Sequence, residues 1–363
     1  MISPVAWIVV LGLTITSAPV LPAHSDDIRR DQWYVESLRL AEAHRHATGQ
    51  DVVVAVVDTG VDPGHPDLRG NVVRGVDLVS GSPSDGRIDA DGHGTGMASL
   101  IAGHGHAEDS GILGVAPQAR ILPVRISTPR VAGDANDVAR GIEWAVEHDA
   151  AVICIPNVGG VSASLMAAVR FAHNRDIVIV AAAGNYPEQS GVAAPASFPG
   201  VVAAAAVDRN GRHHPVSVTG PEIVLAAPGV DIVSASKDRG YRDGTGTSDA
   251  AAIIAGAAAL IRAKYPDLSA EQVIRRLTET ADDRGPAGRD EQYGYGVLDL
   301  VEALTAPLDR STTPARAAPT ADRPGSEGQV TAGPVGLVLF LLLAAAGAGA
   351  LAAALAVRRW RQR

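Results

Sequence analysis

Short, uninterrupted apolar runs recur through the middle of this chain. The first lies at the end of segment 50–57, where five valines and one alanine follow one another. Runs that lack a polar residue at every second position are typical of strands buried on both faces of a parallel sheet. The segments that fit this pattern are 50–57, 150–155, 177–182, 201–207 and 223–226.

Helical patterns lie between several of these predicted strands. Segment 137–148 places its apolar residues on one side of a helix, and segment 164–174 also has a helical pattern. Ser269, with Gln272 three residues later, has the spacing of a capping box and predicts the start of another helix. This alternation predicts an α/β domain with a doubly wound, mostly parallel central sheet flanked by helices.

Both ends of the chain differ from this central pattern. Residues 5–20 are apolar but too short to span a bilayer comfortably, and small residues follow them, which predicts a signal peptide over residues 1–23. Segment 1–4 lacks the Lys or Arg that usually begins a signal peptide, so the alternative of an uncleaved N-terminal membrane anchor stays open. Residues 334–357 carry no charge and precede a basic tail, 358–363, which predicts one C-terminal transmembrane helix.

The remaining segments follow from these assignments. We expect an N-terminal extension over residues 24–49, one domain over 50–308 and a flexible linker over 309–333, where Pro, Ala, Thr and Gly are frequent. Positive residues favour the cytoplasmic side of a membrane. The predicted location is therefore the cell membrane, single-pass, with the domain outside and the C-terminus in the cytoplasm.

Composition narrows the classes of function. A hydrophobic content of 46% suits a globular core, and the net charge of -9 argues against a nucleic-acid partner. Cys154 is the only cysteine, which excludes an internal disulfide. Because its neighbours are apolar, we expect it to be a small buried core residue.

Three motifs carry candidate chemistry: Asp58 in Asp-Thr-Gly after the first strand, His93 before Gly-Thr, and Ser248 after Gly-Thr, the last two at predicted helix starts. Strand C-termini and helix N-termini share one edge of a parallel sheet, so the three can meet. A lone Asp-Thr-Gly also resembles half of an aspartic protease site, but the chain has no second copy. The chain order Asp, His, Ser is that of subtilisin.

The surrounding residues resemble the subtilase family over most of residues 50–300. The similar segments contain Asp58, His93, Asn185 and Ser248, in VVAVVDTGVDPGHPDL, DGHGTGMASLIAG, IVAAAGN and GTGTSDAAAIIAG. With the predicted signal peptide, linker and anchor, the chain most resembles the mycosins associated with type VII secretion. The resemblance implies a subtilisin-like fold and a serine endopeptidase.

The same resemblance implies residue roles. Ser248 would be the nucleophile, His93 the general base and acid, Asp58 its orienting partner, and Asn185 an oxyanion donor. Two edges would bind an extended protein segment as substrate, formed by Val158, Gly159 and Gly160 and by Ala182, Ala183 and Gly184. Where the family usually has Met after the nucleophile this chain has Asp249, and where it has a second His the chain has Gly96.

Partners and cofactors follow as expectations. The leading hypothesis is an endopeptidase acting on exported proteins at the outer membrane face. The alternative is a structural subunit that stabilises a secretion complex with weak or no proteolysis, in contact with membrane components of a type VII system. No cofactor or metal is required by this chemistry. The polar segment 104–109 leaves a structural calcium ion possible but unassigned.

Overall fold

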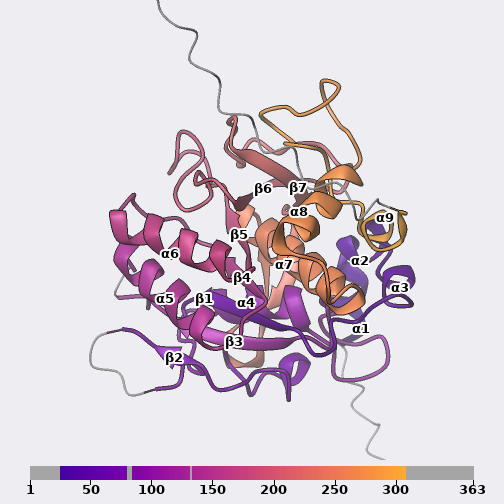
Figure 1. The fold of residues 1–363 in the computed structure, drawn as a ribbon. Coiled ribbons are helices and arrows are strands. Elements are labelled where there is room, and N and C mark those ends of the chain that lie inside the picture. The colour runs from indigo at the N-terminus through magenta and orange to yellow at the C-terminus, as the bar shows by residue number, and fades with distance from the viewer. Residues whose placement is uncertain (1–24, 80–83, 131–132, 308–363) are drawn as a thin grey trace, which may run out of the picture. The chain divides into compact units, whose positions relative to one another are not determined.

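The computed structural model describes residues 25–79, 84–130 and 133–307. Seven strands of this part form one parallel sheet in the order β2-β3-β1-β4-β5-β6-β7 (Figure 1). The strands are β1 (Val53–Asp58), β2 (Val76–Asp77), β3 (Arg120–Arg125), β4 (Val152–Ile155), β5 (Val178–Ala182), β6 (Val201–Val207) and β7 (Ile223–Pro228). The order reverses beside β1, so the predicted doubly wound sheet is confirmed.

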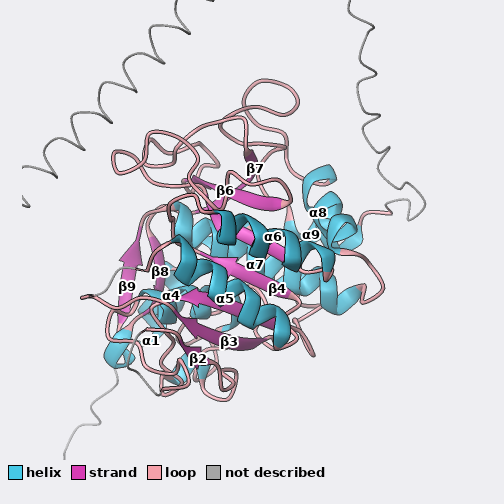
Figure 2. Ribbon diagram, turned by 60° about the vertical axis from the view of Figure 1, so that its left-hand side comes forward, coloured by secondary structure: helices cyan, strands magenta, loops and turns pink. Residues whose placement is uncertain are grey.

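Helices cover both faces of this sheet (Figure 2). The helices after β1 are α4 (His93–Ala102), α5 (Ala135–Glu147), α6 (Ala163–Asn174), α7 (Thr247–Lys264), α8 (Ala270–Glu279) and α9 (Leu300–Thr305). Apolar side chains of α5 and α6 form one core with the sheet. Those of α4, α7, α8 and α9 form a second core on the opposite face. The protein is therefore a three-layer α/β domain.

The predicted elements agree with the structure, which also contains strands that were not predicted. The five predicted strands are β1, β4, β5, β6 and β7, and the helix predicted at Ser269 begins with the expected capping box to Gln272. β3 was not predicted, because Arg120, Pro123 and Arg125 interrupt its apolar pattern. The antiparallel hairpin of β8 (Ile232–Ala235) and β9 (Tyr241–Gly244) was also not predicted.

The residues before β1 pack onto the domain. They form α1 (Ser25–Asp31), α2 (Trp33–Ser37) and α3 (Leu40–Ala43). Tyr34 and Leu40 are fully buried, and the Tyr34 hydroxyl donates to the Leu113 carbonyl at 3.0 Å. The Trp33 indole N–H donates to the Val230 carbonyl at 3.0 Å. These residues therefore complete the domain core.

Several predictions concern residues outside the described part of the chain. The signal peptide over 1–23, the linker over 309–333, the transmembrane helix over 334–357 and the tail over 358–363 all lie there. Among the residues that the structure does describe, no helix is long and apolar enough to cross a membrane. Cys154 is fully buried in the core, as predicted.

Candidate active site

Asp58 and His93 meet at the carboxyl edge of the sheet. Asp58 is the last residue of β1, and His93 is the first residue of α4. The Nδ1 atom of His93 lies 2.7 Å from Oδ2 of Asp58, a hydrogen-bond distance. Asp58 is 2% exposed, whereas the His93 side chain is 23% exposed. The pair therefore joins a buried carboxylate to an imidazole that solvent or substrate can reach.

Two glycines allow this approach of helix and strand. Gly94 follows His93, and a Cβ there would overlap the Gly60 carbonyl oxygen and lie 3.2 Å from Cβ of Asp58. Gly60 itself has φ +104°, a left-handed conformation that favours glycine. The glycines of the Asp-Thr-Gly and His-Gly-Thr motifs are therefore explained by close packing at the edge of the sheet.

Asp89 holds the two motifs together, a role that the sequence analysis did not recognise. Its Oδ1 accepts from the Thr59 hydroxyl at 2.9 Å, and its Oδ2 accepts from the backbone and hydroxyl of Thr95 at 2.9 and 2.7 Å. The Gly94 N–H donates to Thr59 Oγ1 at 3.0 Å. A carboxylate four residues before a predicted helix start was the available signal, because acidic side chains bind free helix N–H groups.

The electrostatic environment favours a protonated His93. Burial opposes the charged imidazolium, but the Asp58 carboxylate and its hydrogen bond outweigh burial and raise the pKa of His93 above its usual value. Asp249 adds to this increase in the pKa, and Arg242 opposes it. The Thr59 backbone N–H donates to the other Asp58 oxygen at 2.7 Å, which fixes the carboxylate.

Ser248 lies in the first turn of α7 and is 9% exposed. The helix begins beside Asn185, whose Oδ1 accepts from the Thr247 N–H at 2.9 Å and from the Thr247 hydroxyl at 3.1 Å. Since Oδ1 is used in this way, the Asn185 Nδ2 amide is directed elsewhere. Asn185 therefore binds the start of the helix that carries Ser248.

Gly246 shows how near these two side chains are. A Cβ at this position would lie 3.1 Å from Nδ2 of Asn185 and 3.4 Å from Oγ of Ser248. The donor and the hydroxyl therefore border the same small space. Among the described residues, Ser248 Oγ makes no hydrogen bond to His93. Catalytic hydrogen bonds are often long without substrate and shorten in the complex.

The two predicted substrate edges differ. Val158, Gly159 and Gly160 line an open pocket of about 580 Å³, together with Gln189, although the Gly159 N–H already donates to the Ala194 carbonyl at 2.9 Å. On the other edge, the Ala183 N–H donates to Ala204 and its carbonyl accepts from Ala193. Gly184 likewise donates to Thr247 and accepts from Val218. Backbone groups of Ala183 and Gly184 are thus already paired within the fold, whereas Ala182 belongs to β5.

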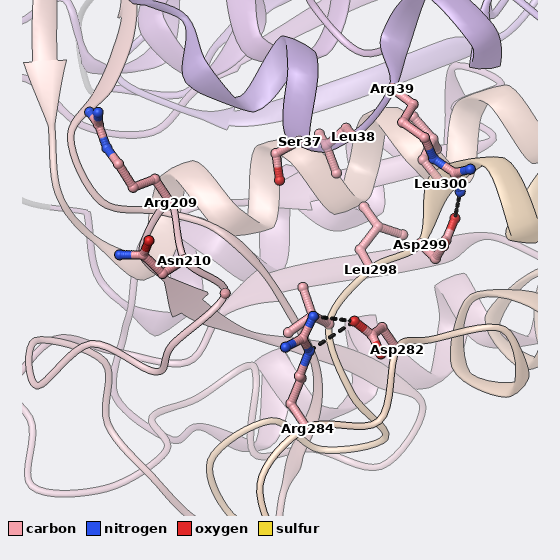
Figure 3. Close-up of a pocket in the computed structure, with 12 residues that line it drawn as sticks. Ser37, Leu38, Arg39, Arg209, Asn210, Asp282, Arg284, Leu298, Asp299 and Leu300 are labelled. Carbon is pink, nitrogen blue, oxygen red and sulfur yellow. Dashed lines mark hydrogen bonds and ion pairs between the residues drawn. The ribbon is translucent and has the colours of Figure 1, made fainter.

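A second pocket of about 270 Å³ lies apart from these residues (Figure 3). None of the predicted site residues lines it. Two of its arginines are paired within it, Arg39 with Asp299 and Arg284 with Asp282 (Figure 3). These pairs offset the positive charge of the pocket, so its chemistry does not single out a ligand.

The polar segment 104–109 uses its histidines within the fold. Nδ1 of His106 lies 2.6 Å from Oδ1 of Asp67, and Nε2 of His104 lies 3.0 Å from the Arg69 carbonyl. Among the described residues, no three His, Cys, Asp or Glu side chains are placed to hold a metal ion. The possible calcium ion therefore stays unassigned.

An aspartate–histidine pair and a serine at a helix N-terminus, all at the carboxyl edge of a parallel sheet, define the class of subtilisin-like serine proteases. The subtilase family profile matches residues 49–296, more than half of the chain. The chain belongs to the subtilase family, which confirms the resemblance predicted from the motifs.

Sequence relatives and solved structures support the assignment to the subtilase family. Subtilisin DY from Bacillus licheniformis is 38% identical over 260 residues, 70% of this chain and 91% of that protein. The MycP3 protease from the type VII (ESX-3) secretion system is 36% identical, with TM-score 0.67 over 76% of this chain and 88% of that one. MycP1 from Mycobacterium smegmatis is 31% identical, with TM-score 0.68 over 78% and 89%. This protein is therefore a subtilisin-like serine protease related to the MycP proteases.

Proposed function

We propose that the chain is an extracytoplasmic serine endopeptidase whose catalytic triad is Asp58, His93 and Ser248. The observation that carries this proposal is the 2.7 Å contact between Asp58 and His93 at the sheet edge where α7 presents Ser248. Burial of Asp58 supports its role as the orienting carboxylate, and partial exposure of His93 leaves its other nitrogen free to exchange protons.

The proposed reaction has two stages. His93 Nε2 takes the hydroxyl proton of Ser248 while Oγ attacks the scissile carbonyl carbon, and Asp58 stabilises the imidazolium. The imidazolium then gives its proton to the leaving amine, and an acyl-enzyme remains on Ser248. Water, deprotonated by His93, hydrolyses this ester and restores the serine. All proton transfers use side chains of this chain, and the step requires no cofactor.

Asn185 would stabilise the oxyanion through Nδ2, together with the Ser248 backbone N–H at the start of α7. The hydrogen bonds from Thr247 to Oδ1 support this role because they orient the amide group. We expect Asn185→Ala to lower kcat by about 10²- to 10³-fold with little change in KM.

The charge-altering variant Asn185→Asp sharpens this test, because it keeps an acceptor for Thr247 and removes the donor. It should lower kcat at least as much, measured as steady-state hydrolysis of an unfolded casein. Asn174→Ala is the control, since Asn174 is exposed at the end of α6 and should keep full activity. Full activity of both Asn185 variants would rule out the oxyanion role.

The proposed substrate is an extended protein segment. Val158, Gly159 and Gly160 would pair with its backbone through groups other than the Gly159 N–H, which donates to Ala194, because small residues let a second chain approach closely. The paired backbone of Ala183 and Gly184 supports a narrower role for Ala182–Gly184 as a wall beside the substrate.

We place this activity at the outer face of the cell membrane, with residues 334–357 as a single-pass anchor and a cytoplasmic C-terminus. The apolar length and basic flank of this segment support the proposal. Similarity to MycP3, a protease from a type VII secretion system, supports exported proteins as substrates and membrane components of such a system as partners.

Labelling with a fluorophosphonate tests the proposed function, because this reagent reacts with an activated serine. We expect the purified full-length chain to be labelled, Ser248→Ala to remain unlabelled, and His93→Ala to react far more slowly. Ser164→Ala, which removes an exposed serine of α6, should be labelled like wild type. A folded wild type that resists the reagent would instead favour the structural subunit of a secretion complex.

A further inference from the structure

Asp249 is an unusual neighbour for the proposed nucleophile. It follows Ser248 on α7 and is 1% exposed. Neither of its carboxylate oxygens has a hydrogen-bond partner among the described residues. A buried carboxylate without such partners lowers the stability of a fold, and groups of this kind are concentrated at functional sites. Asp249 therefore calls for an explanation beyond packing.

Arg242 on β9 faces the same point as Asp249. A Cβ at Gly244 would lie 3.0 and 3.1 Å from the two carboxylate oxygens and 3.1 Å from Nη2 of Arg242. The absent side chain of Gly244 thus leaves a gap bordered by opposite charges. Within the described part of the chain, Arg242 forms no ion pair with Asp249, whose two oxygens have no partner, or with any other carboxylate. The Asp249 carboxylate and the Arg242 guanidinium therefore lie on opposite sides of this gap, and each charge acts separately on the groups around it.

Arg242 also lies against α4, the helix that begins with His93. A Cβ at Gly96 would lie 3.7 Å from Cδ of Arg242 and 3.0 Å from Oγ of Ser234. A histidine side chain at position 96 would compete for this space with Arg242. Ser234 Oγ, like the Asp249 oxygens, is buried without a hydrogen-bond partner among the described residues. Gly96 and Asp249 are positions where this chain differs from the family pattern, and both lie near Arg242. We call Gly96, Arg242, Gly244 and Asp249 the altered region.

We propose that Asp249 and Arg242 are opposed positioning residues for His93: the buried carboxylate favours the imidazolium, and the guanidinium across Gly244 disfavours it. This inference rests on the proposed function of Ser248 and His93. It assigns to the altered region a role in setting the pH range over which the serine is activated.

The directions of the pKa shifts agree with this geometry. Burial raises the pKa of Asp249 to about 6, although Arg242 and His93 oppose the increase. Above that pH the carboxylate is mostly ionised, and its charge adds to that of Asp58 in raising the pKa of His93. Arg242 lowers the pKa of His93. Since only neutral His93 can accept the serine proton, Asp249 reduces reactivity on the acidic side and Arg242 increases it.

Among the described residues, Asp58 and Tyr34 are further titratable groups that interact with this region. Asp58 contacts His93 directly, and its carboxylate is present in every variant considered below. Tyr34 of α2 is fully buried, and burial raises its pKa far above the usual range, with the Asp249 charge contributing. Tyr34 therefore stays neutral in the range where His93 titrates, and the expected pH effects belong to Asp249 and Arg242.

The test measures the second-order rate constant of fluorophosphonate labelling between pH 5 and pH 9 on the full-length chain. The ratio of the rate at pH 6.5 to that at pH 9 should rise roughly threefold to tenfold in Asp249→Asn. It should fall by a similar factor in Arg242→Gln, and the double variant should lie near wild type. Asp243→Asn is the control, because it removes an exposed carboxylate from the same strand and should leave the ratio unchanged.

A purely structural role would not shift the pH profile in opposite directions. The proposal is overturned when Asp249→Asn keeps the wild-type ratio, or when both single variants shift it the same way. NMR titration of His93, assigned with His93→Ala, gives a readout without catalysis: its midpoint should fall in Asp249→Asn and rise in Arg242→Gln. If the midpoints shift as expected but the protein is never labelled, the proposed function is refuted, whereas the roles of Asp249 and Arg242 toward His93 stand.

Discussion

Replacement of Ser248 by alanine is expected to lower kcat for hydrolysis of an unfolded casein by about 10⁶-fold. The variant lacks the only atom that can form the acyl-enzyme, while the start of α7 stays intact because Thr247, not Ser248, bonds to Asn185. Steady-state release of peptides measures the loss. Circular dichroism and thermal melting close to those of wild type would show that the fold is retained.

His93→Ala should cause a loss of similar size, and the double variant should be no worse than either single one. Residues that act as one unit show this strong non-additivity, because removal of one member already disables the others. Independent, multiplying losses in the double variant would contradict a shared step. Retention of more than about 1% of kcat by Ser248→Ala would place the nucleophile elsewhere.

Asp58→Asn is expected to lower kcat at neutral pH by about 10⁴-fold. The Thr59 N–H donates to Oδ1, so this position should keep an oxygen in the variant. The new amide nitrogen then points at His93 Nδ1 and donates to it. His93 must carry its proton on Nε2 instead, where it can no longer accept the proton of Ser248.

Asp91→Asn provides the matched control for this variant. Asp91 is exposed, and its Oδ1 accepts from the His93 backbone N–H at 3.3 Å, which an asparagine oxygen can also do. Its kcat should stay within about threefold of wild type. A similar loss in both variants would show that general charge near His93, not the tautomer, matters. Substrate hydrolysis at pH 7 and pH 9 separates the two cases.

Much of the central fold was predictable because its signals are local. The runs that became β1, β4, β5, β6 and β7 are continuous and apolar, which requires burial on both sheet faces. The motifs around Asp58 and His93 were predictable for a related reason, since their glycines serve packing at a strand end and a helix start.

β3 could not be predicted from such a pattern. Successive backbone N–H groups of β3 point to opposite sides of the strand. The Arg120 N–H donates to Val52 beside β1, and the Ile121 N–H donates to Asn71 on the other side. By this alternation, the nitrogen of Pro123 falls on the side away from β1, where the short β2 pairs only with Val124 and Arg125. Proline is tolerated there because β2 offers no acceptor that would require a backbone N–H at position 123. Only the order of the strands in the sheet reveals this.

The sequence by itself determined the class of fold, the family and the candidate residues Asp58, His93, Asn185 and Ser248, because each depends on neighbours in the chain. The tertiary structure alone decided which groups lie between the motifs. Asp89 joins Thr59 to α4. The β8–β9 hairpin places Arg242 on the opposite side of the Gly244 gap from Asp249. Charge acts through space, so the environment of His93 depends on residues whose separation along the chain carries no signal.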